Sequence, residues 1–350
     1  MTERIRAVVI SAGAWSQSSH LPTLAAHPLV DIIAVSSPDF DLARALAEEF
    51  GAKRAESQWT DALTCSPDIV VVSSPPIAHE EQVIAALRAG AHVLVEKPFA
   101  LDAGAAQRMH AAAQEAQRAL LVGFGWPAAP IFALAKSLID ENEVGSIEHI
   151  TMHLAVNTRA LLSGGLDGGW GGVRSSSSTT YTDRGVSGGG AAAVSMSHQL
   201  GLIGWLTGER IENVAASTYP RGSAIDLHVS VNAGLSGGGS AAISTASTHP
   251  YSTRPQWHLA LYGDRGQIWL DSMNDQLRLV RSNGEVVEYQ SPQASGVYDA
   301  GAPTTALIYC ALGEPAPASL SSVLAVHVVE VTDSIYASAD SGSTVPVGQA

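Results

Sequence analysis

The chain contains few of the residues that mark several protein classes. Two cysteines, Cys65 and Cys310, occur among 350 residues, and their spacing is not that of a pair. A disulfide framework or a thiolate zinc site needs more cysteines at closer spacing, so we expect neither and predict no metal site. No window approaches the length of a membrane span, and the start MTERIRAVVI lacks the longer apolar region of a signal peptide. These absences favour a cytoplasmic protein.

Positive charge is also scarce. The sequence has 19 Lys and Arg against 33 Asp and Glu, which gives a formal net charge of -14. Phosphate backbones and anionic lipid repel such a chain, which argues against nucleic acid and membrane surfaces as partners. At 350 residues, with 46% hydrophobic and 15% charged content, the chain exceeds what one hydrophobic core usually fills. We therefore expect two domains and a small-molecule ligand.

Short apolar runs rich in Val and Ile recur through the first third of the chain. Helical patterns lie between them, as in 41–50 (DLARALAEEF) and 79–89 (HEEQVIAALRA), where apolar residues stand three and four apart. Apolar strands that alternate with helices indicate a parallel sheet buried on both faces. We predict an α/β fold with a doubly wound, Rossmann-type domain over residues 1–124. Its strands are expected at 5–10, 30–35, 69–73, 92–95 and 120–123.

The turn after the first expected strand has the outline of a phosphate-binding loop but lacks two of its three glycines. Aligned with G-x-G-x-x-G, it reads Ser11-Ala12-Gly13-Ala14-Trp15-Ser16. Gly13 keeps the position at which a missing side chain lets the backbone approach the pyrophosphate. An ordinary tight turn is the alternative. The residues predicted to bind a dinucleotide here are Ala12, Gly13, Ala14, Trp15 and Ser16.

An acidic residue is missing where such domains usually hold the ribose of NAD. The second expected strand ends Val35-Ser36-Ser37-Pro38-Asp39, and Ser37 occupies the acidic position. A hydroxyl does not repel a 2′-phosphate as a carboxylate would, so NADP is permitted. We expect NADP or NAD as the cofactor, with a slight preference for NADP. Arg44 could approach a 2′-phosphate, and a surface arginine without a ligand is the alternative.

Two further stretches carry a resemblance to a known family. Ser73-Ser-Pro-Pro-Ile-Ala-His79 and Ala91-His-Val-Leu-Val-Glu-Lys-Pro-Phe99 resemble the paired signature of the Gfo/Idh/MocA oxidoreductases, the glucose-fructose oxidoreductase and inositol dehydrogenase family. The resemblance covers nearly the whole chain. It continues through Val122-Gly-Phe124, Gly188-Gly-Gly190 with His198, Trp205-Leu-Thr-Gly208 and Tyr262-Gly-Asp-Arg-Gly266.

The resemblance implies that a lysine, here Lys97, lies near the nicotinamide and the substrate hydroxyl. An ammonium there stabilises the charge that develops on the substrate oxygen and eases hydride loss from the same carbon. A surface cation, or a simple ion pair of Glu96 with Lys97, is the alternative. Beyond the loop, the cofactor-binding candidates are Ser37, Ser74, Pro75, His79, Glu96, Lys97 and Trp126.

Two departures from the family pattern bear on the chemistry. Many members carry an aspartate four residues before the histidine, one helical turn away, but this chain has Val194 there. We predict that Lys97 and His198 are the catalytic residues, with His198 suited to taking a proton near neutral pH. A hydrogen-bonded, packed histidine is the alternative. Gly125-Trp126-Pro127 also lacks an arginine that members often place there, which leaves Trp126 as a possible wall of the nicotinamide pocket.

After Ser146 the pattern changes to successive strands. Apolar and polar residues alternate over 227–233, and Asn283-Gly284 predicts a two-residue hairpin between 277–280 and 286–287. We expect residues 125–350 to form a C-terminal α+β domain for substrate binding and oligomerisation, with a large, mostly antiparallel open sheet. The resemblance implies assembly through that sheet, as a homodimer or homotetramer. Helices are expected near 304–312 and 321–339.

A segment rich in Gly, Ser and Thr spans residues 161–190 and leads into the helix expected to carry His198. A loop this long in a compact domain is usually functional or disordered. We predict that it covers the substrate, and a linker without a ligand role is the alternative. The substrate-binding candidates are Lys97, Trp170, Arg174, Tyr181, Arg184 and His198.

These expectations describe an NAD(P)-dependent oxidoreductase that interconverts a secondary alcohol and a ketone on a sugar, cyclitol or related polyol. Two alternatives stay open. An enzyme on this scaffold could use bound nicotinamide transiently to assist elimination, cleavage or isomerisation. The altered glycine loop and the absent aspartate also allow a non-catalytic binding or regulatory protein.

Overall fold

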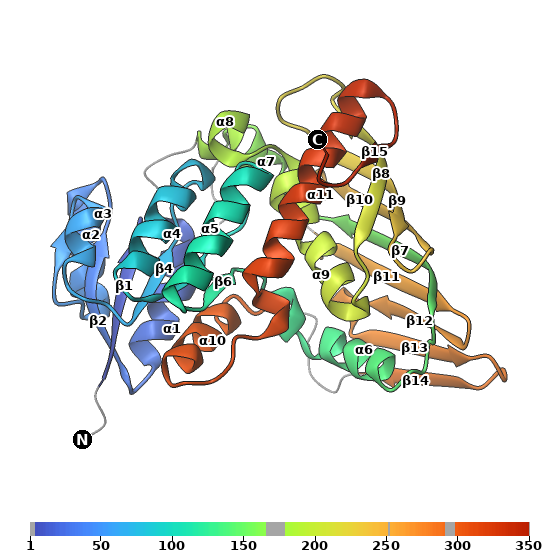
Figure 1. The fold of residues 1–350 in the computed structure, drawn as a ribbon, viewed down its shortest axis with the longest axis horizontal. Coiled ribbons are helices and arrows are strands. Elements are labelled where there is room, and N and C mark those ends of the chain that lie inside the picture. Colours follow the sequence, from blue (N-terminus) through green and yellow to red (C-terminus); the bar gives the residue numbers. More distant parts are fainter. Residues whose placement is uncertain (1–3, 166–178, 251–252, 291–297, 350) are drawn as a thin grey trace. The chain divides into compact units, whose positions relative to one another are not determined.

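The computed structural model describes residues 4–165, 179–250, 253–290 and 298–349, and the other residues are grey in Figure 1. The described chain divides into two compact units. The first unit holds residues 4–124, 179–180 and 300–326. The second holds residues 125–165, 181–250, 253–290, 298–299 and 327–349. The first unit therefore takes its residues from both ends of the sequence.

The first unit is built on a six-stranded sheet in the order β3-β2-β1-β4-β5-β6. All of its strand pairs are parallel, and every residue of β4 is fully buried, as a sheet covered on both faces requires. This confirms the doubly wound prediction, with each of the five expected strands placed to within one residue. The strands are β1 (Ile5–Ile10), β2 (Val30–Ser36), β3 (Ala55–Glu56), β4 (Ile69–Val72), β5 (His92–Val95) and β6 (Leu120–Val122).

The helices of the first unit include one from the far end of the chain. The helix α10 (Ala302–Ala311) packs against β4, β5 and β6 and contacts α1 (Leu21–Ala26). A π-helical segment, Ser16–His20, leads directly into α1. The remaining helices of this unit are α2 (Phe40–Phe50), α3 (Trp59–Leu63), α4 (His79–Arg88) and α5 (Ala103–Ala116).

The second unit is built on a nine-stranded sheet in the order β14-β13-β12-β11-β7-β10-β9-β8-β15 (Figure 1). The β7–β10 pair is parallel and the other pairs are antiparallel, which confirms the mostly antiparallel open sheet. The strands are β7 (Ile147–Ala155), β8 (Ile211–Tyr219), β9 (His228–Leu235), β10 (Ser240–Ala246), β11 (Gln256–Gly263), β12 (Gly266–Asp271), β13 (Gln276–Arg281), β14 (Val286–Gln290) and β15 (Val345–Pro346).

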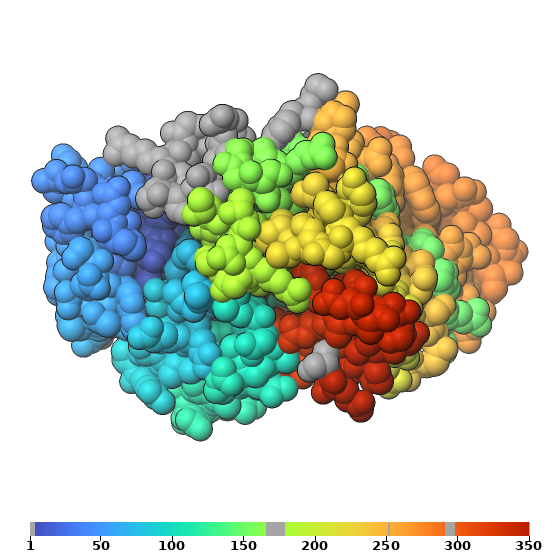
Figure 2. All heavy atoms as spheres, turned by 90° about the horizontal axis from the view of Figure 1, so that it is seen from above, coloured from blue at the N-terminus to red at the C-terminus, as the bar shows by residue number. Residues whose placement is uncertain are grey.

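Helices cover one face of this sheet. The helix α6 (Pro130–Asp140) contacts β13, and α9 (Ser197–Thr207) contacts β7 and α6. Burial alternates along β9, so the other face carries polar and exposed side chains. In Figure 2 the C-terminal residues (red) lie beside the residues near 210–245 (yellow), as the pairing of β15 with β8 requires. The remaining helices are α7 (Arg159–Leu162), α8 (Arg184–Ser187) and α11 (Ser322–Ser341), the last of which begins in the first unit.

The hairpin between β13 and β14 differs from the expected two-residue turn. Arg281 N–H donates to Glu285 O at 2.9 Å, which leaves Ser282, Asn283 and Gly284 as a three-residue loop. Gly284 has a φ of 85°, the left-handed conformation that this loop type needs at its third residue. The Asn283-Gly284 pair therefore predicted the hairpin correctly, but the predicted loop length of two residues was wrong. Within the described ranges, no helix has the length and apolar character needed to cross a membrane.

Candidate active site

The turn after β1 takes a glycine-like path with a serine. Ser11 has a φ of 57°, in the left-handed region that glycine adopts without strain. Gly13 is different, because among the described residues a Cβ placed on it would meet no atom closer than Ser11 O at 3.9 Å. The packing of the chain itself does not require a glycine there. The bare backbone at Gly13 therefore fits the close approach of a dinucleotide phosphate.

Ser16 stands where the third glycine of the motif would pack helix against strand. It is fully buried, and its Oγ has no hydrogen-bond partner among the described residues. An unsatisfied buried hydroxyl costs about 1–3 kcal/mol, so the chain tolerates the serine at an energetic cost. Ser16 is the first residue of the π-helical segment, and N–H groups in the first turn of a helix favour anions. Ala12 N–H is already used, since it donates to Ser36 O at 2.9 Å.

The end of β2 presents no charged group at the ribose position. Ser37 is 4% exposed, and its Oγ accepts the Asp39 N–H at 3.2 Å. Arg44 forms an ion pair with Asp41 at 2.9 Å on the surface of α2. The Ser37 side chain is therefore held by the turn that follows β2 and brings no charge to this position. The Arg44 guanidinium is already paired with the Asp41 carboxylate.

His79 ties the turn after β4 to the turn after β5. Its Nε2 lies 2.8 Å from Ser74 O and its Nδ1 lies 3.1 Å from Phe99 O. Burial lowers the pKa of His79, against the opposing effect of these carbonyls. Ser74 Oγ donates to Gln82 Oε1 at 2.6 Å, which anchors the same turn to α4. The signature residues after β4 thus support the loop that carries Pro75.

Glu96, directly after β5, is held by several N–H donors. Its Oε1 accepts the indole N–H of Trp15 at 3.0 Å and lies 3.1 Å from His20 Nε2. Its Oε2 accepts the backbone N–H of Lys97 at 3.2 Å. A Cβ on Gly123 would overlap this carboxylate, which explains the glycine after β6. The Glu-Lys-Pro signature therefore holds a buried, oriented carboxylate beside Lys97.

His20 links that carboxylate to α10. Its ring is fully buried, and its Nδ1 lies 2.8 Å from Thr304 Oγ1. Burial acts to raise the pKa of Glu96, but the hydrogen bond and charge of His20, with the charge of Lys97, leave it below its usual value. Burial lowers the pKa of Lys97, and the charge of Glu96 opposes that effect. Sequence reasoning did not single out His20 or Thr304.

The glycines before His198 are explained by two close approaches in the second unit. Asp226, which is 1% exposed, accepts N–H bonds from Gly190 at 3.1 Å and from Ala192 at 2.9 Å. Tyr336 donates its hydroxyl to Asp226 Oδ1 at 2.8 Å. A Cβ on Gly189 would overlap the Tyr336 hydroxyl, and one on Gly190 would overlap the Asp226 backbone. No motif or pattern in the sequence pointed to Asp226 or Tyr336.

His198 lies in the first turn of α9, where it is 9% exposed. Its ring packs edge-on against Tyr298, with ring centroids 5.5 Å apart. Val194 is buried in a second π-helical segment, Ala192–Met196, so no carboxylate stands at the expected spacing. Trp126 stacks on Trp257 with centroids 5.1 Å apart and meets the same Tyr298 ring edge-on. Trp126 and His198 therefore share one aromatic neighbour.

Two family models match the chain. One, described as "Oxidoreductase family, NAD-binding Rossmann fold", covers residues 5–124. The other, "GFO/IDH/MocA C-terminal domain", covers residues 132–269. The chain belongs to the Gfo/Idh/MocA oxidoreductase family. This confirms the resemblance inferred from the Glu-Lys-Pro signature and the residues around it.

Individual members of the Gfo/Idh/MocA family match over shorter stretches. A dTDP-3,4-didehydro-2,6-dideoxy-alpha-D-glucose 3-reductase from Actinomadura kijaniata is 34% identical over 134 residues, or 38% of this chain and 40% of that protein. A levoglucosan dehydrogenase from Pseudarthrobacter phenanthrenivorans is 34% identical over 122 residues, or 34% of this chain and 30% of that protein. The matches thus span less than half of these relatives. A solved complex of levoglucosan dehydrogenase with NADH and levoglucosan shares the fold, with a TM-score of 0.83, 19% identity, and coverage of 99% of this chain and 100% of that one.

The other residues predicted to bind substrate lie in different parts of the chain. Arg184 lies over the Tyr336 ring, with its guanidinium carbon 4.0 Å from the centroid, so it packs on the residue that supports Asp226. Tyr181 lies in a short 3-10 turn, Thr180–Thr182. Trp170 and Arg174 lie outside the described residues. Lys97 belongs to the first unit and His198 to the second.

Proposed function

We propose that this protein is an NAD(P)-dependent oxidoreductase that interconverts a secondary alcohol and a ketone on a sugar, cyclitol or related polyol. The observation that carries the proposal is the set of turns after β1, β4 and β5, which are neighbours in the sheet. Together they offer the bare backbone of Gly13 and the oriented Glu96 carboxylate, next to Lys97 in the chain, at the edge where such sheets bind dinucleotides. The names of the two matched relatives, a sugar reductase and a sugar dehydrogenase, support the substrate class.

The chemistry divides between two side chains. The bound dinucleotide supplies the hydride acceptor in oxidation and the donor in reduction. Lys97 donates a hydrogen bond to the reacting oxygen and stabilises its developing negative charge. His198 takes the hydroxyl proton in oxidation and returns it in reduction. Trp126, Tyr181, Trp170 and Arg174 remain our candidates for lining the pocket.

The slight preference for NADP rests on Ser37. Its hydroxyl accepts a backbone N–H and presents no carboxylate to a 2′-phosphate. We therefore expect NADPH to bind at least as tightly as NADH. Titration of each reduced cofactor, followed by nicotinamide fluorescence, measures this. A strong preference for NADH would contradict the interpretation of Ser37.

A combined binding and turnover assay tests the function. The protein is titrated with both dinucleotides and then incubated with each cofactor and a panel of pyranosides and cyclitols. Substrate-dependent change in nicotinamide absorbance supports the oxidoreductase. Product formation without net absorbance change, with cofactor retained through purification, would favour transient redox assistance instead. No binding at millimolar dinucleotide would favour a non-catalytic protein.

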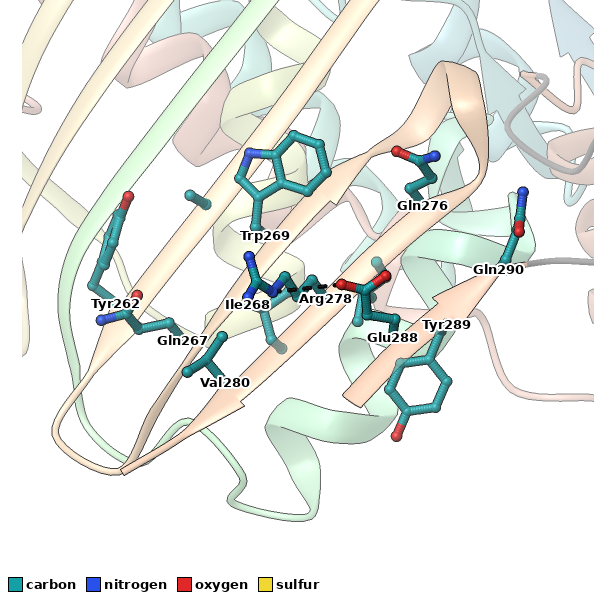
Figure 3. Close-up of a pocket in the computed structure, with 12 residues that line it drawn as sticks. Tyr262, Gln267, Ile268, Trp269, Gln276, Arg278, Val280, Glu288, Tyr289 and Gln290 are labelled. Carbon is teal, nitrogen blue, oxygen red and sulfur yellow. Dashed lines mark ion pairs between the residues drawn. The ribbon is translucent and has the colours of Figure 1, made fainter. Parts of the chain in front are cut away.

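We also propose a homodimer or homotetramer that forms through the open face of the C-terminal sheet. Trp269 is 43% exposed and Tyr262 is 37% exposed on this face. They line a groove with Arg278 and Glu288, whose side chains form an ion pair at 3.7 Å (Figure 3). Exposed aromatic rings in one groove are typical of a surface that a partner covers. A second copy of this chain is the partner that we propose.

A further inference from the structure

Two side chains at the two ends of the π-helical segment Ser16–His20 contact the same oxygen atom. The Trp15 indole N–H donates to Glu96 Oε1, and His20 Nε2 lies 3.1 Å from that atom. In an α-helix, residues five apart point about 140° away from each other. Here the Leu21 N–H bonds to Ser16 O, which is the five-residue step of a π-helix. The π-helical segment therefore turns Trp15 and His20 toward one carboxylate.

Hydrogen bonds from these groups take the place of water around the buried Glu96 carboxylate. Oε1 faces the indole and the imidazole, while Oε2 accepts the Lys97 backbone N–H. Hydrogen bonds to the charged form keep a buried carboxylate ionised. Burial lowers the pKa of Lys97, and the negative charge of Glu96 opposes that effect because it favours the ammonium form.

Thr304 contacts the His20 nitrogen that faces away from Glu96. A carboxylate can only accept, so His20 Nε2 must carry the hydrogen that faces Glu96. The other ring nitrogen, Nδ1, lies 2.8 Å from Thr304 Oγ1. Thr304 comes from α10 and is fully buried, so the ring is held at both nitrogens. The charge of Glu96 also acts on His79, from α4, where it opposes the lowering of the pKa by burial.

We propose that Trp15 and His20 are positioning residues that hold Glu96 as an oriented anion, which favours the ammonium form of Lys97. Thr304 assists by holding the His20 ring in place. The inference rests on the proposed function only where Lys97 is said to stabilise the reacting oxygen. The protonation state of Lys97 is a property of the first unit and can be measured without substrate or cofactor.

The test measures the pH dependence of Lys97 acetylation by acetic anhydride in dinucleotide-free protein, quantified by mass spectrometry. Exposed Lys53 serves as the internal reference. In Glu96→Gln we expect the Lys97 midpoint to fall by about one pH unit or more, since an opposite charge within a few ångströms commonly shifts a pKa by that amount. His20→Leu and Trp15→Phe should lower it in the same direction by less.

Two conservative variants separate positioning from packing. His20→Gln keeps an N–H that can reach Glu96 and should restore the Lys97 midpoint, whereas Thr304→Val should lower it as His20→Leu does. His110→Gln is the matched control, because His110 Nδ1 also meets a hydroxyl, Ser322 Oγ at 2.9 Å, away from Glu96. Near-ultraviolet circular dichroism checks that each variant is folded. If His20→Leu does not fold, Trp15→Phe and Thr304→Val carry the test.

Two outcomes would overturn the proposal. The first is an unchanged Lys97 midpoint in folded Trp15→Phe and Thr304→Val while Glu96→Gln shifts it. The second is His20→Gln behaving like His20→Leu, which would assign the effect to imidazole charge instead of the hydrogen bond. If turnover is found, its basic limb should move with the acetylation midpoint. Absence of turnover would contradict the proposed function and leave the acetylation result as it stands.

Discussion

At the scale of single residues, the phosphate loop replaces glycine in two different ways. Ser11 replaces the first glycine by adopting the left-handed backbone conformation of a glycine, with a φ of 57°. Ser16 replaces the third glycine with a small side chain, but its buried hydroxyl has no hydrogen-bond partner among the described residues. Gly13 is kept although the described residues leave room for a side chain there, as expected of a position that a ligand approaches. The motif in the sequence located the loop, but only the structure separates these three roles.

Ser16→Ala should raise the free energy of unfolding by about 1 kcal/mol or more, because it removes a buried hydroxyl that no described residue bonds. Urea denaturation of the dinucleotide-free protein measures the change. Ser18→Ala is the control, since the exposed Ser18 hydroxyl donates to Trp15 O near the same turn. A lower unfolding free energy in Ser16→Ala would mean that the hydroxyl is satisfied in solution.

Lys97→Ala and His198→Ala should each lower turnover about 100-fold or more, the usual scale for groups that transfer or stabilise a proton. Dinucleotide affinity should stay nearly unchanged in His198→Ala. Steady-state kinetics together with fluorescence titration separates the two effects. Unchanged turnover and an unchanged pH profile in His198→Ala would remove it from the mechanism.

At the scale of elements, both π-helical segments precede residues of the candidate site. Ser16–His20 follows the phosphate loop, and Ala192–Met196 precedes His198. Segments of this kind often occur at functional sites, because one extra residue per turn redirects the side chains that follow. Apolar runs predicted the strands of the first sheet well, since buried parallel strands are rich in Val and Ile. Helical periodicity assumes 3.6 residues per turn, so it could not predict that Trp15 and His20 meet at Glu96.

Tyr336→Phe should lower the free energy of unfolding by about 1–3 kcal/mol, because buried Asp226 loses the hydroxyl that donates to its Oδ1. Burial and the Asp226 carboxylate both raise the pKa of Tyr336 well above its usual value, so the hydroxyl stays protonated. Chemical denaturation measures the loss. Tyr309→Phe, at a 41% exposed ring on α10, should change the stability little. Equal effects in the two variants would contradict the role of the Asp226 contact.

At the scale of the whole molecule, charge and composition predicted two domains and a small-molecule ligand but could not predict how the chain is shared. Residues 300–326 join the first unit although they follow the sheet of the second in sequence. Periodicity identified the helix near residue 304, but the packing partner of a helix depends on surfaces far away in the sequence. His20 and Thr304 show the result, because 284 positions separate two residues in hydrogen-bond contact.

Trp269→Glu should shift the protein toward a smaller assembly, because a carboxylate in the groove would be desolvated against a second copy. Light scattering coupled to gel filtration measures the mass over a range of concentrations. Phe40→Glu is the control, since Phe40 is 48% exposed on the first unit. A wild-type protein that is monomeric at all concentrations would contradict assembly through this face.

The placement of α10 has a consequence for synthesis on the ribosome. The strands β4, β5 and β6 are complete once residue 122 has been made, but the helix that packs on them ends at Ala311. At the usual rate of translation, about 10 to 40 s separate these two events. During that interval the nascent nucleotide-binding domain exposes an apolar face of its sheet. The growing chain would offer that face to a ribosome-associated chaperone until its own C-terminal helix arrives.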